Sequence, residues 1–191
     1  MKALTLCHPW PFAVAYLGKG VENREWDDRL AHLMGVHEMT GQLVAIHGGR
    51  APTRPRRANV LPTNPWRQFT GDLGHIRDTI LGGELPDAAA QYLAGRDGPL
   101  APEHFILPGI VAVATLSGST RSSREPWAAS GCLHLLLSEV IALPKPVQCP
   151  GAQGFWKVPE VIEKDVTAQY RAAINARPRQ WESFSGRDWL Q

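Results

Sequence analysis

The sequence predicts an α+β fold in which β-structure dominates and the strands form a mixed barrel. The 191-residue chain contains 18 glycines and 16 prolines, which is typical of a protein with many turns and short strands. Few helices separate the strands, which argues against a parallel sheet covered on both faces. The expected strands lie at residues 2–7, 21–26, 42–47, 110–116, 133–143 and 155–158.

Helices are expected at four places along the chain. An apolar run over residues 10–17 lies between Pro9 and Gly18, which suit the start and the end of a short helix. Apolar residues recur at helical spacing over 66–80, and residues 86–94 form a second helical segment that ends at Gly95. A longer amphipathic helix follows Pro159.

The domain organisation follows from the order of these elements. Residues 1–158 form one domain, which a partly helical insertion interrupts at about residues 51–107. Residues 159–191 form a C-terminal helix and a tail that pack on the same domain. Residues 27–41 carry no clear pattern.

The net charge is only +2, so any nucleic-acid contact must depend on local charge. The arginines are clustered, and each cluster either solvates the surface or contacts phosphates. The candidate phosphate-contacting residues are Arg50, Arg54, Arg56 and Arg57 in a Pro-rich stretch, and Arg121 and Arg124 in a Ser-rich loop.

Other classes of protein fit the sequence less well. Cys7, Cys132 and Cys149 are far apart and form no C-x-x-C pair, which favours a reducing compartment, and we expect a cytoplasmic protein. The N-terminus does not resemble a signal peptide, no apolar run reaches transmembrane length, and no membrane partner is expected. The sequence has no phosphate-binding loop and no metal-ligand spacing, so we expect no cofactor and no metal.

Residues 18–24 read Gly-Lys-Gly-Val-Glu-Asn-Arg and hold the most informative group of charges. Alternation along a strand places Glu22 and Arg24 on one face, and Lys19 follows the end of the first helix. A carboxylate between two cations stays ionised and holds both in place. Spacing alone leaves open whether this group is a binding site or a surface ion-pair cluster.

The first part of the chain resembles the signature of ASCH-domain proteins in the PUA-like superfamily. That signature is a strand, then Pro-Trp at the start of a helix (here Pro9-Trp10), and then the motif G-K-x-x-E-x-R. Residues 46–50, 109–116, 134–140 and 151–156 resemble further segments of that family in the same order. The resemblance covers about residues 2–50 and 109–158. It implies a PUA-like β-barrel of the ASCH type with a cleft beside the motif.

The resemblance also implies recognition of RNA or of a modified nucleoside. Some relatives remove an acetyl group from the exocyclic nitrogen of cytidine, and others are proposed ribonucleases. In the amidohydrolases a Thr stands three residues after the motif Lys, whereas this chain has Glu22 there, which could act as a general base but not as a hydroxyl nucleophile.

We therefore expect an RNA-binding module with a nucleotide-sized cleft, for which DNA is a second candidate ligand. One alternative is a hydrolase that uses Lys19 and Glu22 as catalytic residues on an acylated nucleoside or on RNA, and another is a protein-interaction domain. Aromatic rings beside cations suit single-stranded RNA, although the same rings could be core. The candidate ligand-binding residues are His8, Trp10, Lys19, Glu22, Asn23, Arg24, Trp26 and His47.

Overall fold

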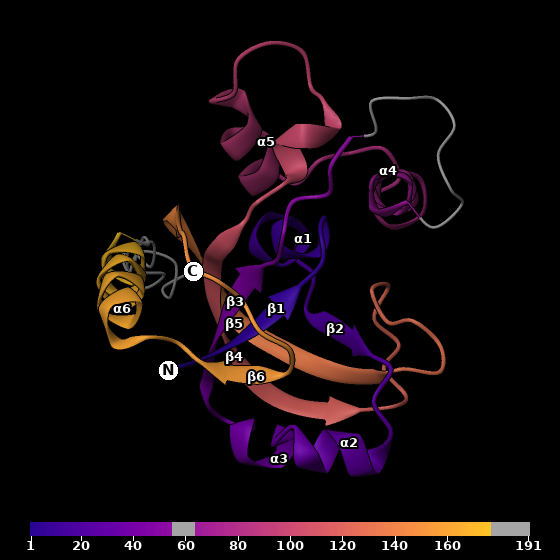
Figure 1. The fold of residues 1–191 in the computed structure, drawn as a ribbon. Helices are drawn as coiled ribbons and strands as arrows, with labels where there is room; N and C mark the ends of the chain where they lie inside the picture. The colour runs from indigo at the N-terminus through magenta and orange to yellow at the C-terminus, as the bar shows by residue number, and fades with distance from the viewer. Residues whose placement is uncertain (55–63, 177–191) are drawn as a thin grey trace, which may run out of the picture.

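The computed structural model describes residues 1–54 and 64–176 (Figure 1). The described residues form an α+β structure around one six-stranded sheet that curls into a half-barrel, in the order β2-β5-β4-β3-β1-β6. The strands are β1 (Lys2–Leu6), β2 (Val21–Arg24), β3 (Leu43–Gly48), β4 (Gly109–Thr120), β5 (Leu133–Val147) and β6 (Phe155–Lys157). The predicted mainly β character and the single curved sheet are thus confirmed at this level.

The pairing of the strands gives their relative directions and accounts for the curvature of the sheet. β1 runs parallel to β3, with Lys2 opposite Val44 and Leu6 opposite Gly48, while the other neighbours are antiparallel. The register of β4 against β5 shifts at three places, and such bulges bend a strand and increase its twist. β4 and β5 are also longer than the strands predicted at 110–116 and 133–143.

The two faces of the sheet bury different sets of side chains. Leu4 and Ile46 pack on the same side as α1 (Trp10–Tyr16), whose Phe12 is fully buried. Ala3 and Ala45 point to the other side and pack in a separate apolar cluster with Val166 of α6 (Glu160–Asn175). This division follows from the two-residue period of a strand, and it places α1 and α6 on opposite faces of the sheet (Figure 1).

The unpatterned segment after β2 forms two short helices, α2 (Asp28–Leu33) and α3 (Val36–Met39). Asp27 caps α2 by accepting a hydrogen bond from the backbone N–H of Leu30 at 2.7 Å. Gly35 lies between the two helices with a φ of +72°, a conformation that glycine adopts without strain. Neither helix is long enough to show a reliable apolar period.

The insertion is partly helical, as predicted, and packs over α1. Its elements are α4 (Pro65–His75), the π-helix η1 (Ile76–Ile80), α5 (Asp87–Ala94) and the 3-10 helix η2 (Pro102–Phe105). Tyr92 of α5 stacks on Tyr16 with ring centroids 4.4 Å apart, and the ring of Phe105 meets Phe12 at 4.9 Å. Within residues 1–54 and 64–176, no helix combines the length and the apolar character that crossing a membrane requires.

Candidate functional site

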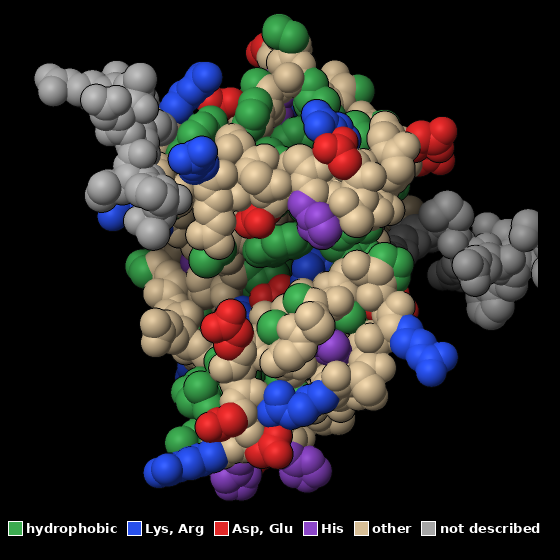
Figure 2. Space-filling view, turned by 90° about the vertical axis from the view of Figure 1, so that its right-hand side faces the viewer, with side chains coloured by type: hydrophobic (Ala, Val, Ile, Leu, Met, Phe, Trp, Pro, Cys, Tyr) green, Lys and Arg blue, Asp and Glu red, His purple; other side chains and the backbone are tan. Residues whose placement is uncertain are grey.

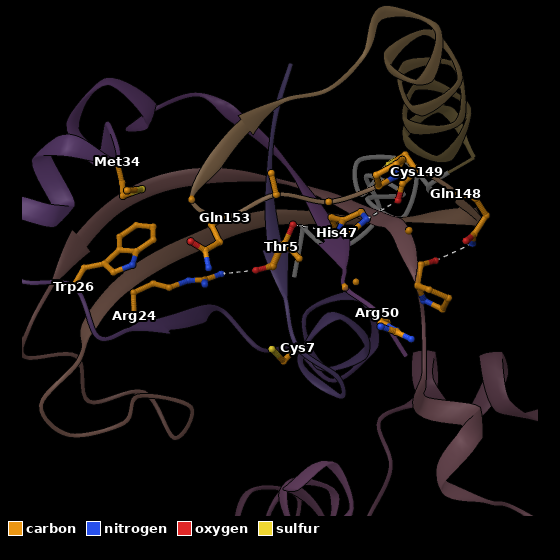
Figure 3. Close-up of a pocket in the computed structure, with 18 of the residues that line it drawn as sticks. Thr5, Cys7, Arg24, Trp26, Met34, His47, Arg50, Gln148, Cys149 and Gln153 are labelled. Carbon is orange, nitrogen blue, oxygen red and sulfur yellow. Dashed lines mark hydrogen bonds between the residues drawn. The ribbon is translucent and has the colours of Figure 1, made fainter. Parts of the chain in front are cut away.

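A cleft of about 820 Å³ opens where β1 and β3 end side by side (Figure 3). Because these two strands are parallel, their carboxyl ends meet at one edge, and the chain leaves both strands there. Thr5 comes from β1, Arg24 from β2, and His47 from β3, while Trp26 and Met34 flank α2. The connection from β5 to β6, residues 148–154, forms the opposite wall.

Thr5 and His47 join the floor of the cleft to its wall by a chain of hydrogen bonds. The indole Nε1–H of Trp156 donates to the Thr5 hydroxyl at 3.0 Å, and that hydroxyl lies 3.2 Å from Nδ1 of His47. Nε2 of His47 faces the carbonyl oxygen of Cys149 at 3.1 Å, so Nε2 carries the proton and Nδ1 accepts from Thr5. The ring is 2% exposed, and burial lowers the pKa of His47 below its ordinary value. His47 is therefore neutral, and its hydrogen bond to the Cys149 carbonyl links β3 to the wall.

Gly151 closes tightly over this floor. A Cβ at this position would lie 2.4 Å from Cε1 of His47 and 2.7 Å from the Thr5 hydroxyl oxygen, distances that no ordinary contact allows. A residue with a side chain would thus push the wall away from His47. The absence of a Cβ at residue 151 lets the backbone cover the imidazole.

Arg24 brings a cation into the cleft in a fixed position. Its Nη2 donates to the carbonyl oxygen of Thr5 at 2.8 Å and lies 3.3 Å from Oε1 of Glu22. The guanidinium lies over the Trp26 ring, 5.5 Å from the centroid. Nε of Arg24 is buried and has no hydrogen-bond partner among the described residues. An acceptor brought by a ligand would relieve that unsatisfied donor.

Lys19 and Glu22 form the buried support of Arg24. Nζ of Lys19 donates to Oε2 of Glu22 at 2.9 Å and also to the carbonyl oxygen of Val21, and it lies over the Trp10 ring at 5.5 Å. The Lys19 side chain is 1% exposed and that of Glu22 is 8% exposed. Neither residue lines the cleft. The motif thus forms two linked ion pairs, in which the Glu22 carboxylate joins the buried Lys19 ammonium to the arginine in the cleft.

His8 and Asn23 hold the surroundings of the cleft and do not line it. Nε2 of His8 donates to the carbonyl oxygen of Gly49 at 3.0 Å, and the N–H of Leu107 donates to Nδ1 at 3.3 Å. Burial lowers the pKa of His8, the bond to Gly49 opposes this, and the nearby His47 adds to the lowering. Asn23 turns away from the cleft and bonds the backbone of the 121–132 loop, at the Trp127 carbonyl and the Ala129 N–H.

Those of the predicted phosphate-contacting arginines that the structure describes differ in their surroundings. Arg50 lines the cleft, whereas Arg54 lies 3.6 Å from Glu103 and over the Trp66 ring. Arg121 is bound to Asp28 at 2.7 Å and to the carbonyl of Trp26. Arg124 is exposed, and Arg56 and Arg57 lie outside the described residues.

Figure 2 shows one face of the molecule, on which basic and acidic side chains alternate around a hollow and form no continuous basic patch. Several cleft residues were not expected from the sequence, namely Thr5, Met34, Gln148, Gly151 and Gln153. The turn at 150–154 was visible as a Gly- and Pro-containing segment, but its closure over β1 and β3 depends on the pairing of β6 with β1.

Taken together, the described residues define an α+β protein with a curled half-barrel sheet and a cationic, aromatic cleft at the end of its parallel strand pair. No protein-family model matches the chain, and no curated protein matches it. Within the part of the chain that the structure describes, no group of three or more His, Cys, Asp or Glu side chains is placed to hold a metal ion.

Proposed function

We propose that this protein is an RNA-binding module that holds one nucleotide of a single strand in the cleft at the end of β1 and β3. The observation that carries the proposal is the lining of that cleft. Among the described residues its charged side chains are Arg24 and Arg50, and Trp26 lies against Arg24. Single-stranded RNA recognition uses this combination, because bases stack on aromatic or guanidinium planes while cations hold phosphate.

The size and polarity of the cleft support the same class of ligand. A volume of about 820 Å³ lies within the range of small-molecule sites and suits a nucleotide with adjoining backbone. His47 is neutral, and both of its ring nitrogens already have partners, so it adds no charge to the floor. Gln148 and Gln153 are exposed at the wall; Nε2 of Gln148 donates to the Pro108 carbonyl at 2.9 Å, which leaves its amide oxygen and the Gln153 amide to meet a base edge.

The placement of Lys19 and Glu22 favours a supporting role over a catalytic one. Nζ of Lys19 already has two acceptors, the Val21 carbonyl and Glu22, and both side chains are buried behind Arg24. A catalytic base must come within hydrogen-bond reach of the atom from which it takes a proton. We therefore propose binding, with the two residues fixing the cleft arginine.

The test is a binding screen at low salt with labelled single-stranded RNA and DNA decamers and with nucleosides, followed by mass spectrometry of each mixture. We expect RNA to bind and to be recovered unchanged. Trp26→Ala should weaken RNA binding by about 5- to 150-fold, which corresponds to about 1–3 kcal/mol for one stacked base. Trp66→Ala, which removes a half-buried indole from α4, serves as the control and should leave affinity unchanged.

Two results would contradict the proposal. Absence of RNA binding at low salt would overturn it, since backbone contacts are strongest there. Release of acetate from an acetylated cytidine, or cleavage of the RNA, would assign the site to a hydrolase. In that case Lys19→Met should abolish turnover.

A further inference from the structure

We infer that the cleft imposes one direction on the nucleotide that it holds, with the base at the Arg24–Trp26 end and the phosphate at the Arg50 end. The inference rests on the proposed function and deepens it. Figure 3 shows Arg24 and Trp26 at one end of the cleft, Arg50 and Gln148 toward the other, and Thr5 and His47 between them.

The Arg24 end suits an uncharged base because part of its positive charge is already offset by Glu22, a carboxylate that Arg24 shares with Lys19. Oε1 of Glu22 lies 3.3 Å from Nη2 of Arg24, and Nη2 also donates to the Thr5 carbonyl. The other donors of Arg24 are Nε, which is buried and has no partner among the described residues, and Nη1, for which those residues provide no hydrogen bond. A base edge offers a neutral acceptor to such a donor, and the Trp26 ring and guanidinium plane offer a stacking surface.

The Arg50 end suits a phosphate because its cation is not compensated. Arg50 is exposed, and no carboxylate among the described residues lies within ion-pair distance of it. It follows Gly48 and Gly49, which also line the cleft and add no side chain between Arg50 and the floor. An arginine without a carboxylate partner keeps its full charge and its fork of donors for a phosphate.

The opposite direction fits the same residues less well. A phosphate at Arg24 would approach the carboxylate of Glu22, which is buried and cannot turn into water. A base at Arg50 would meet Pro108, Gly109 and Gln148, none of which offers an aromatic plane. Weaker attraction for the phosphate at one end and loss of stacking for the base at the other therefore both act against the reversed ligand.

The experiment measures how much a phosphate adds to binding. Titration calorimetry gives the dissociation constants of uridine, cytidine, guanosine and adenosine and of their 5′-monophosphates, and the ratio within each pair is the gain from the phosphate. We expect the wild-type protein to bind each monophosphate about tenfold more tightly than its nucleoside. Arg50→Gln should bring the ratio close to one and leave the nucleoside affinities unchanged.

A variant at the Arg24–Trp26 end should change the affinity for the base and leave the gain from the phosphate unchanged. Trp26→Leu keeps an apolar side chain in the packing but removes the aromatic plane, so it should weaken nucleosides and monophosphates by the same factor and leave the ratio unchanged. Arg54→Gln is the matched control, since this exposed arginine of the same segment lies beside Glu103, and it should change neither quantity.

These measurements test the direction of the bound nucleotide separately from whether the protein binds RNA. If Arg50→Gln leaves the ratio unchanged, or if Trp26→Leu reduces it, the direction is wrong even though the cleft binds nucleotides. If no nucleoside or monophosphate binds, the direction is also wrong, and the RNA screen alone then decides the proposed function.

Discussion

At the scale of single residues, the geometry of the cleft depends on a carboxylate that lies behind it. Glu22 is 8% exposed and contacts both Nζ of Lys19 and Nη2 of Arg24. Replacing one member of a buried ionic group leaves the remaining charge without compensation, which costs more than the pair contributes. Glu22 therefore affects both the stability of the protein and the position of the cleft arginine.

We expect Glu22→Gln to lower the free energy of unfolding by about 3–5 kcal/mol, because Lys19 is left buried without a counterion. Urea denaturation measures the change. The double variant Lys19→Met/Glu22→Gln should recover most of the loss, and the exposed Glu25→Gln is the control, with an expected change within about 0.5 kcal/mol. A loss below about 1 kcal/mol for Glu22→Gln would show that the chain Lys19–Glu22–Arg24 is not tightly coupled.

The two buried histidines predict how stability depends on pH. Burial lowers the pKa of His8 and of His47 below the ordinary value of 6.5. As the pH falls through 6.5, the unfolded chain takes up protons at these positions before the folded protein does, so stability is complete above that pH and declines below it. The decline stops once the pH is low enough to protonate the folded imidazoles as well.

Urea midpoints between about pH 8 and pH 5 test this expectation. His47→Gln, whose amide can still donate to the Cys149 carbonyl, should flatten the decline. His32→Gln replaces an exposed imidazole and should leave the slope as it is in the wild type. A slope that His47→Gln does not alter would mean that His47 titrates normally in the folded protein.

From the sequence, the shared face of Glu22 and Arg24 was easier to predict than the contacts of the neighbouring side chains. Glu22 and Arg24 do project together, because alternation along a strand is a local rule. Asn23 and His8 were expected to bind a ligand, but they bond the backbone at Trp127, Ala129 and Gly49. Those partners are distant in sequence, and local patterns carry no information about them.

At the scale of elements, the insertion is attached to the domain by aromatic rings. Phe12 and Tyr16 of α1 meet Tyr92 of α5 and Phe105 of η2, with centroid separations between 4.4 and 5.7 Å. Aromatic pairs at these distances contribute beyond the area they bury. α1 thus contacts the sheet on one side and the insertion on the other.

Tyr92→Ala should loosen α5 from α1 and lower the free energy of unfolding by about 2–3 kcal/mol, because it removes the ring that stacks on Tyr16. Limited proteolysis of the insertion provides the second measurement, and cleavage within residues 64–107 should become faster. The neighbouring exposed Gln91→Ala is the control. Unchanged proteolysis in Tyr92→Ala would mean that other contacts hold the insertion in place.

Elements with strong patterns were predictable, and those set by long-range pairing were not. All six predicted strands form, as do α1 and α5. The register shifts between β4 and β5 were not predictable, because they depend on how the two strands bend together. The short helices α2 and α3 carry too few turns for an apolar period, and their positions follow from capping by Asp27 and the turn at Gly35.

At the scale of the whole molecule, the face in Figure 2 carries both signs of charge, and the charged residues that line the cleft are two arginines. The net charge of +2 provides little general attraction to a polyanion, so RNA binding should depend on few phosphate contacts. Arg121 is already paired with Asp28, and Arg54 is close to Glu103, whereas Arg50 is free of carboxylates among the described residues.

We expect RNA binding to weaken with salt, and Arg50→Gln to reduce the negative slope of log K against log salt by about 0.7, the value for one phosphate contact on a single strand. Arg121→Gln should leave the slope nearly unchanged, because this guanidinium is bound to Asp28 at 2.7 Å. Fluorescence anisotropy with an RNA decamer between about 50 and 200 mM salt measures both slopes. Equal reductions in the two variants would show that the surface arginines share the backbone contacts.

The position of β1 between β3 and β6 has a consequence for synthesis on the ribosome. β1 is made first, yet one of its edges pairs with residues 155–157, which leave the ribosome about 150 residues later. Until then β1 has an open edge, and no pairing with β1 holds the wall at residues 148–154 in place. The cleft is therefore complete only after β6 has paired with β1, and the long sequence separation of this pairing is of the kind that slows folding. A nascent chain that stops before β6 would contain most of the sheet but no closed binding site.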